Sequence, residues 1–366
     1  MSIKSGSLSY LALQRFKKNL WGVFSLAIIL VIGFVAIFAY VFAPDNSQYA
    51  NQMQLSLHSM PPGFETTLLS VPNNNTNQQQ SKLSKWFFGN KNPDTQIPIS
   101  DYRIENDQII YTEFTPNSSI KVEKEIPLGV FQGQDISKHI KVTKFVFGTD
   151  KYGRDLLSRI MIGARISFFI GFIAVFISLV IGIFLGSIAG FYGGKVDALV
   201  MWIINVTWSI PTLLLVIAIT LALGKGFWQV FIAVGLTMWV EVARVVRGQI
   251  MSLKEMQYVT AARALGYNDF RIITKHILPN IMAPVIVIAA ANFAAAILIE
   301  SGLSFLGLGA QPPMASWGAM IKDHYNYIIL GKPYLALIPA FCIMLLVMSF
   351  MLVGNALRDA FDVKAS

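Results

Sequence analysis

Six long hydrophobic stretches alternate with polar connections along this chain of 366 residues. They cover residues 20–43, 166–190, 198–222, 228–246, 282–299 and 334–354. A helix needs about 20 mostly apolar residues to cross the roughly 30 Å hydrocarbon core of a bilayer. The pattern therefore predicts an all-α polytopic membrane protein with six transmembrane helices.

Particular prolines and glycines refine this picture of the spans. Pro211 and Pro284 fall inside the third and fifth stretches, where we expect kinks or broken turns. The second stretch carries Gly182, Gly186 and Gly190 at four-residue spacing. Such a stripe of small residues lets a second helix approach closely in lipid. We expect these glycines to serve helix packing rather than ligand binding.

Composition agrees with a membrane protein, since 54% of the residues are hydrophobic and 13% are charged. Soluble domains carry about 25% charged residues. The net charge of +9 does not indicate nucleic acid binding, because the basic residues fall at the ends of apolar runs and in one polar segment instead of one patch. The first stretch is too long for the apolar part of a signal peptide and is expected to be a retained anchor.

Lysine and arginine positions predict the orientation of the spans. Both the N-terminal segment 1–19 and the connection after the fourth span are basic, and we expect them in the cytoplasm together with the C-terminal tail 355–366. The basic residues concerned are Lys4, Arg15, Lys17, Lys18, Arg244, Arg247, Lys254, Arg263, Arg271 and Lys275. The opposite side carries Lys225, Lys322 and Lys332 in its short connections.

Residues 44–165 then form a long extracytoplasmic segment. Alternating apolar and polar positions in 109–114 and 120–126 favour short β-strands, and the low-complexity stretch 70–82 is expected to be a flexible loop. From Asp155 onward we expect an amphipathic helix lying along the outer interface.

The connection 247–281 carries the most informative pattern. Residues 255–265 have helix-forming composition, Gly266 can end that helix, Asn268 can cap a second one, and Pro279 is expected to end the second helix before the fifth span. Ala261 and Ala262 would leave a shallow face suited to docking into a groove on another protein. An ordinary amphipathic interfacial loop is the alternative.

This connection resembles the EAA motif of binding-protein-dependent ABC importers. Ala261, Ala262, Gly266, Leu278 and Pro279 stand at the motif's positions. The chain departs from the motif where Thr260 replaces the glutamate and where His276 replaces the isoleucine. The resemblance implies that residues 255–279, including Glu255, couple the permease to an ATPase.

Three further segments resemble the C-type subunits of dipeptide and oligopeptide permeases, within the peptide and nickel importer family. They are residues 147–167, 300–318 and 354–362, with Asn355 where an aspartate is expected. The resemblance implies a type I permease with a core over 166–354, located in a bacterial inner membrane. It implies four partners besides the bilayer: a second permease, two ABC ATPase subunits and an extracytoplasmic substrate-binding protein. The segment 46–145 is longer than the corresponding segment expected for this family.

Charged residues near the outer ends of the spans have two interpretations each. Asp150, Arg154, Asp155 and Arg159 either form a gate network or belong to a solvated interfacial turn. Glu300 either pairs within the translocation vestibule or caps the next turn. Towards the other side, Glu241 is expected to pair with Arg244 at i+3.

The sequence lacks the residues that several classes of function require. The sequence has no phosphate-binding loop, no nucleophile elbow and no clustered histidines or cysteines, so we expect neither catalysis nor a metal site nor a bound cofactor. ATP and magnesium would bind to the partner subunits. An ion-driven secondary transporter is the alternative class, although we find neither a convincing internal repeat nor mid-span charges.

Overall fold

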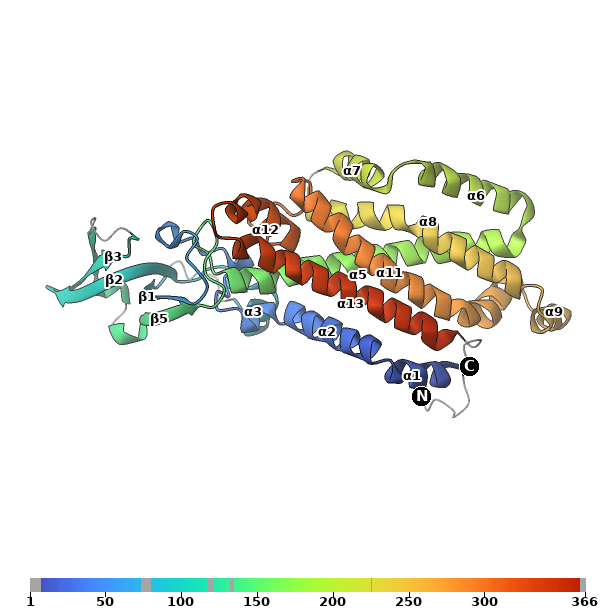
Figure 1. Ribbon diagram of the computed structural model, residues 1–366, viewed down its shortest axis with the longest axis horizontal. Helices are drawn as coiled ribbons and strands as arrows, with labels where there is room; N and C mark the ends of the chain where they lie inside the picture. The colour runs from blue at the N-terminus through green and yellow to red at the C-terminus, as the bar shows by residue number, and fades with distance from the viewer. Residues whose placement is uncertain (1–7, 74–79, 117–121, 132–134, 225, 363–366) are drawn as a thin grey trace. The chain divides into compact units, whose positions relative to one another are not determined.

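The computed structural model describes residues 8–73, 80–116, 122–131, 135–224 and 226–362 (Figure 1). Lys4, Lys225, residues 74–79 of the low-complexity stretch and Ile120 lie outside the described residues. The chain divides into two compact units. The first comprises Met1–Ile32, Ser167–Gln311 and Phe341–Ser366, and the second comprises Gly33–Ile166 and Pro312–Ala340.

Within the described residues, five helices are long and apolar enough to cross a membrane, and the number is six if one bent pair is counted as a span. The five are α2 (Leu20–Ile37), α5 (Leu156–Tyr192), α8 (Phe227–Leu253), α11 (Leu278–Phe305) and α13 (Tyr334–Phe361). The pair is α6 (Gly194–Ser209) and α7 (Thr212–Leu223), bent by 93°. The expected number of spans is confirmed.

The bend between α6 and α7 has a local cause in proline chemistry. Ile210 is extended, with φ −92° and ψ 127°, and Pro211 follows it as the N-cap of α7. A residue that precedes proline is pushed out of the helical region by the proline ring. The expected break at Pro211 is confirmed. Pro284, in contrast, lies inside α11, which continues through it as one helix.

The expected interfacial helix that starts at Asp155 is wrong as a separate element. Helix α5 begins at Leu156 and runs without interruption into the second span. Its first turns are covered by protein rather than by water, because the Trp317 indole packs against Gly163 and donates from Nε1 to the Ile160 carbonyl at 3.0 Å. Because protein covers these first turns of α5, they do not need a polar face toward water.

Helices α5 and α8 approach so closely that three glycines of α5 leave no room for a side chain. A Cβ added at Gly182 would lie 2.5 Å from Val242 Cβ, and one at Gly186 would lie 2.5 Å from the Ala243 carbonyl oxygen. At Gly190 the added atom would lie 2.8 Å from the Arg247 carbonyl oxygen. All three glycines therefore lie along the line where the two helices touch.

Helices α6 and α8 are joined by an ion pair. Arg247 on α8 donates from Nη2 to Asp197 on α6 at 2.6 Å, and its Nε also bonds the same carboxylate. Both side chains are mostly buried. The α5–α8 and α6–α8 contacts make α8 the central helix of the first unit.

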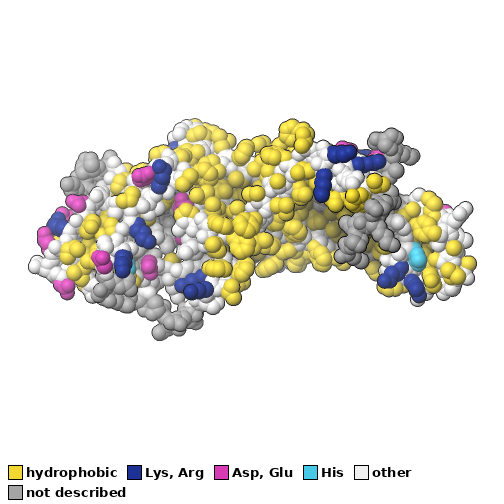
Figure 2. Space-filling view, turned by 90° about the horizontal axis from the view of Figure 1, so that it is seen from below, with side chains coloured by type: hydrophobic (Ala, Val, Ile, Leu, Met, Phe, Trp, Pro, Cys, Tyr) yellow, Lys and Arg dark blue, Asp and Glu magenta, His cyan; other side chains and the backbone are white. Residues whose placement is uncertain are grey.

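Hydrophobic side chains cover much of the surface of the spans (Figure 2). On α5 they recur every four residues, with Phe176 68%, Val180 53% and Phe184 63% exposed. Apolar residues at this spacing occupy one face of a helix. A face of this kind suits contact with lipid.

The second unit holds a five-stranded antiparallel sheet in the order β4-β3-β2-β1-β5 (Figure 1). Its strands are β1 (Phe64–Val71), β2 (Thr95–Glu105), β3 (Gln108–Glu113), β4 (Glu123–Pro127) and β5 (Ile140–Phe145). Leu69, Ile99, Ile109 and Phe131 are buried together on the sheet. The two strands expected from alternating residues correspond to β3 and to the described part of β4.

Short helices complete the chain. The α-helical ones are α1 (Leu8–Lys18), α3 (Ala39–Phe42), α4 (Lys82–Phe88), α9 (Gln257–Ala264), α10 (Asp269–Arg271) and α12 (Trp317–His324). The 3₁₀ turns are η1 (Gln48–Ala50), η2 (Leu55–Leu57), η3 (Leu128–Phe131), η4 (Ile136–Lys138) and η6 (Tyr325–Ile328). A π-helical segment, η5 (Ile272–Ile277), leads into α11.

Replacing Gly186 by alanine is expected to destabilise the α5–α8 contact by about 1–3 kcal/mol, because the new methyl group overlaps the Ala243 carbonyl. The measurement is thermal unfolding of the purified protein in detergent. Gly248→Ala on α8 is the matched control, since nothing lies within 4 Å of its added Cβ. Equal unfolding temperatures for the two variants would contradict this packing.

Candidate functional site

The connection between α8 and α11 begins with helix α9, which ends at a glycine in the left-handed region. Gly266 has φ +77°. Its N–H bonds the Arg263 carbonyl at 2.9 Å, and the Tyr267 N–H bonds the Ala262 carbonyl at 3.2 Å. Such a left-handed ending favours glycine. The expectation that Gly266 ends this helix is confirmed, whereas Glu255 lies in the turn before it.

The next helix starts as expected but does not stop as expected. The Asn268 side chain accepts from the Arg271 N–H at 2.8 Å, which caps α10. Beyond it, α10, η5 and α11 form one helix from Asp269 to Phe305. The expected end at Pro279 is therefore wrong. In the π-helical η5 the Leu278 N–H reaches back to the Ile273 carbonyl, and this widened turn accommodates the proline ring in the first turn of α11.

The connection is packed firmly onto the spans. One buried cluster joins Val259 and Ala262 of α9 to residues of α10, η5 and the spans. Its other members are Phe191, Val242, Val246, Ile250, Ile272, Ile277, Ile281 and Val285. Movement of α9 therefore displaces α8 and α11 as well, because close-packed interiors transmit strain.

The opposite face of the connection is exposed. Thr260, Ala261 and Gly266 lie on it, together with two large apolar side chains, Leu265 at 71% and Phe270 at 76% exposure. Ala262, expected on the same face as Ala261, is instead 3% exposed in the buried cluster. Ala262 stands three residues after Val259 and shares the buried face of α9 with it, whereas Ala261 does not.

Leu265 and Phe270 were missed as site residues. Their only sequence signal is hydrophobicity in a polar connection, and that signal does not distinguish an exposed position from a buried one. Exposed apolar side chains beside buried ones indicate a surface that contacts another molecule. We call the exposed residues Thr260, Ala261, Leu265, Gly266 and Phe270 the outer face of the connection.

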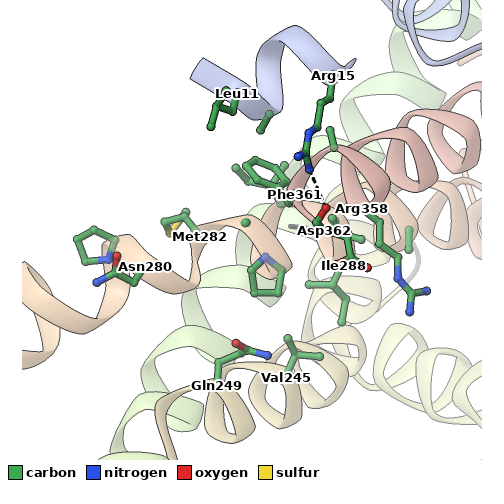
Figure 3. Close-up of a pocket in the computed structure, with 18 of the residues that line it drawn as sticks. Leu11, Arg15, Val245, Gln249, Asn280, Met282, Ile288, Arg358, Phe361 and Asp362 are labelled. Carbon is green, nitrogen blue, oxygen red and sulfur yellow. Dashed lines mark hydrogen bonds between the residues drawn. The ribbon is translucent and has the colours of Figure 1, made fainter. Parts of the chain in front are cut away.

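A cavity of about 1070 Å³ lies beside the start of α11 (Figure 3). Pro279 and Asn280 line it, with Val245 and Gln249 of α8 and Leu11 of α1. Charged side chains at its wall are Arg15, Glu241, Arg358 and Asp362. Figure 3 shows Arg15 turned toward Asp362, whose carbonyl oxygen accepts from Arg15 Nη1 at 2.8 Å.

Glu241 faces this cavity instead of pairing as expected. Arg244 donates from Nη2 to Asn205 Oδ1 at 2.9 Å, and its guanidinium lies 3.6 Å from the centre of the Trp208 ring. These contacts hold Arg244 against α6. The predicted ion pair between Glu241 and Arg244 is therefore wrong, and the Glu241 side chain is exposed at the cavity.

In the second unit, the charged residues before and in α5 come together. Asp150 accepts from Arg154 Nε at 2.7 Å, and Arg159 Nε lies 3.7 Å from the same carboxylate oxygen. Arg154 also reaches Asn51 Oδ1 at 2.9 Å. Asp150 is 0% and Arg154 3% exposed. The solvated-turn interpretation is therefore wrong for this cluster, which ties the turn before α5 to the segment after α3.

Asp155 caps a helix, whereas Asp150 pairs with arginines. Its carboxylate accepts from the Ser158 N–H at 2.8 Å and from the Ser158 hydroxyl, and it thereby caps the N-terminus of α5. Burial raises the pKa of Asp155, and the hydrogen bonds from Ser158 oppose that rise. Arg159 donates to the Tyr49 carbonyl at 3.1 Å.

Segments distant in the sequence meet in each unit. In the second unit, Lys151 pairs with Asp323 at 3.1 Å, and its N–H donates to His324 Nε2 at 3.3 Å. In the first unit, Pro279 and Arg358 line the same cavity. The family-like segment at 147–167 thus meets the region just after 300–318, and residues of 255–279 and of 354–362 line one cavity.

Comparison with known families decides what kind of protein carries these sites. The profile of the family described as "binding-protein-dependent transport system inner membrane component" matches residues 182–365, about half of the chain. A second profile, the "N-terminal TM domain of oligopeptide transport permease C", matches residues 7–62.

The chain belongs to the family of binding-protein-dependent transport system inner membrane components.

Individual relatives agree with this permease family. The dipeptide transport system permease protein DppC of Bacillus subtilis is 44% identical over 218 residues, which cover 60% of this chain and 68% of that protein. The oligopeptide transport system permease protein OppC of Haemophilus influenzae is also 44% identical over 218 residues, with 60% and 70% covered. A solved MetNI methionine ABC transporter chain matches with TM-score 0.44 and 20% identity, over 54% of this chain and 94% of that chain.

The permease sequence between the two profiles is matched by neither of them. That gap covers residues 63–181, and the whole five-stranded sheet lies inside it. The sheet therefore stands outside the part of the permease that carries the family signal.

Glu300 of the permease is fully buried in α11. The Ser304 hydroxyl, one turn further along the same helix, donates to its Oε1 at 2.7 Å. This bond is internal to α11. Among the described residues, no group of three histidine, cysteine, aspartate or glutamate side chains could hold a metal ion.

Asp150→Asn is expected to destabilise the permease by about 3–5 kcal/mol, because it leaves two buried guanidinium groups without their carboxylate. Glu65→Gln is the matched control, since the Glu65–Lys144 pair in the same unit is more than half exposed and contributes little. Thermal unfolding in detergent measures both variants. If both unfold at the wild-type temperature, the buried cluster does not hold this unit together.

Proposed function

We propose that this permease is one of two membrane subunits of an ATP-driven importer, and that an ATPase subunit docks on the outer face of the connection. The observation that carries the proposal is the two-sided packing of α9. Val259 and Ala262 are buried against the spans, while Ala261 and Leu265 point away from them. An element with one face fixed to the spans and one face free suits the transfer of motion from a partner.

The proposed coupling follows the packing step by step. A docked ATPase displaces α9, and Val259 passes the displacement to Val246 and Ile250 of α8. Ile272 and Ile277 pass it to the start of α11. Helices α8 and α11 then tilt together, and the translocation path opens alternately to either side of the membrane. This chain holds no ATP in the proposal, and ATP and magnesium belong to the two ATPase subunits.

We infer that the cavity beside α11 is this subunit's share of the path. It lies next to the connection, and Glu241 and Arg15 supply opposite charges on its wall. The relatives named above are dipeptide and oligopeptide permeases, so peptides are the proposed cargo. A second permease would form the rest of the path, and a substrate-binding protein would deliver the peptide. Membership of this family argues against the ion-driven alternative.

We further propose that both termini lie in the cytoplasm and that the segment before α5, residues 44–155, lies on the outer side of the inner membrane. The basic residues of α1, namely Arg15, Lys17 and Lys18, support this orientation, as do those of the connection.

Cysteine labelling tests this orientation. In a Cys342→Ser background, Lys141→Cys on β5 is expected to react with a membrane-impermeant maleimide in spheroplasts, because its position is exposed on the sheet. Lys275→Cys, exposed in the connection, is expected to react only after permeabilisation. The reverse pattern would overturn the orientation.

Docking on the outer face has its own test. Ala261→Asp places a charge on the outer face without disturbing the buried cluster, so the ATPase subunits co-expressed with the permease are expected to be lost on purification. Insertion and thermal stability should stay at wild-type values. Ser252→Asp, exposed in the last turn of α8, is the matched control and should retain the ATPases. Full retention of the ATPases by Ala261→Asp would remove the docking assignment.

A further inference from the structure

Helix α4, in the connection between β1 and β2, exposes an unusual amount of apolar surface. It has seven residues, Lys82–Phe88, and none of them is buried. Leu83 is 65%, Trp86 50%, Phe87 41% and Phe88 62% exposed. Contiguous exposed apolar surface marks a place where another molecule is bound.

The helix is amphipathic in spite of its length. Leu83, Trp86 and Phe87 stand at positions i, i+3 and i+4, which share one face. Lys82 and Lys85, also three residues apart, form a second, charged row. Aromatic residues on one face with lysines on another are typical of helices that lie in the interface of a membrane.

Helix α4 is held in a fixed position. Ser81 caps its N-terminus, and Gln80 donates from Nε2 to the Gly89 carbonyl at 2.9 Å. The Asn90 N–H donates to the Asn46 carbonyl at 2.8 Å, and the Gln48 N–H donates to the Asn90 carbonyl at 2.9 Å. Because these bonds close both ends of the segment, its apolar face is presented by the fold and is not a feature of a loose loop.

The element beside α4 is the continuation of the first span. Helices α4 and α3 are in contact, and a Cβ at Gly89 would lie 2.7 Å from the Tyr40 ring. Arg165 strengthens this junction by donating to the Phe87 carbonyl, with its guanidinium 5.1 Å from the centre of the Tyr40 ring. The apolar face of α4 therefore lies at the end of a membrane-spanning helix.

The exposed surface of the span continues up to α4. Ile37 is 41%, Val41 46% and Phe42 49% exposed. On a spanning helix such residues contact lipid, and the boundary between hydrocarbon and water is where tryptophan and other amphipathic aromatic residues gather. The face of α4 extends the lipid-contacting surface of the span at this boundary.

We propose that α4 is an interfacial membrane anchor, with Leu83, Trp86 and Phe87 inserted into the phospholipid bilayer beside the first span and Lys82 and Lys85 among the headgroups. The anchor restrains the inserted sheet, because α4 lies between β1 and β2 in the chain. The proposal rests on α2 being a span and does not depend on docking of an ATPase.

Spin labels on the full-length protein in phosphatidylcholine–phosphatidylglycerol liposomes test this anchor. In a Cys342→Ser background, one label replaces Leu83 (Leu83→Cys) and a control label replaces Val142 (Val142→Cys), an apolar residue of β5 that is 72% exposed in the same unit. Oxygen concentrates in lipid, whereas a charged or polar nickel complex stays in water. We expect the ratio of oxygen to nickel accessibility to be several-fold higher at residue 83 than at residue 142.

Two outcomes overturn the proposal. Equal ratios at residues 83 and 142 would place α4 in water, and low accessibility to both reagents at residue 83 would mean that protein covers it. Trp86→Ser with Phe87→Ser supplies a second measurement. Because no residue of α4 is buried, this double variant should keep the wild-type unfolding temperature in detergent. It should lower the ratio at residue 83 toward that at residue 142, and an unchanged ratio would contradict anchoring by these aromatic side chains.

Discussion

Apolar packing between α9 and the ends of α8 and α11 is the contact on which the proposed coupling depends. Val259 and Ala262 enter the same buried cluster as Ile250 and Ile281. Because these side chains are fully enclosed, the connection cannot shift without moving the two spans. The glycine contact between α5 and α8 extends this rigidity to a third helix. A push on the outer face would therefore act on a block of helices rather than on a single loop.

Several charged residues that are buried or mostly buried fix local geometry. Asp150 holds two guanidinium groups, Asp155 caps α5, and Arg247 joins α8 to α6 through Asp197. Each of these three side chains has a polar or oppositely charged partner, as expected where desolvation is costly. The cavity differs, since Glu241 stands exposed at its wall. In the proposed path, the Glu241 carboxylate is thus accessible from the cavity, whereas the charges of the cluster before α5 are buried.

Much of the fold could be predicted from local patterns. Hydropathy located the spans, and the special backbone requirements of Gly266, Asn268 and Pro211 located three boundaries. These signals depend only on neighbouring residues. The errors came from contacts that join distant parts of the chain. Arg244 bonds Asn205 rather than Glu241, and the turn at Asp150 is buried by residues near Asn51, about 100 positions away.

The π-helical segment has a consequence for the relation between the connection and the membrane. Its six residues, Ile272–Ile277, are bonded five apart instead of four, so the helix holds one residue more than regular winding allows. Each residue turns an α-helix by about 100°. If all six residues wound as a regular α-helix instead, α10 would be rotated relative to α11 by about that angle. The widened turn therefore sets the rotational phase between the connection and the helix that crosses the bilayer.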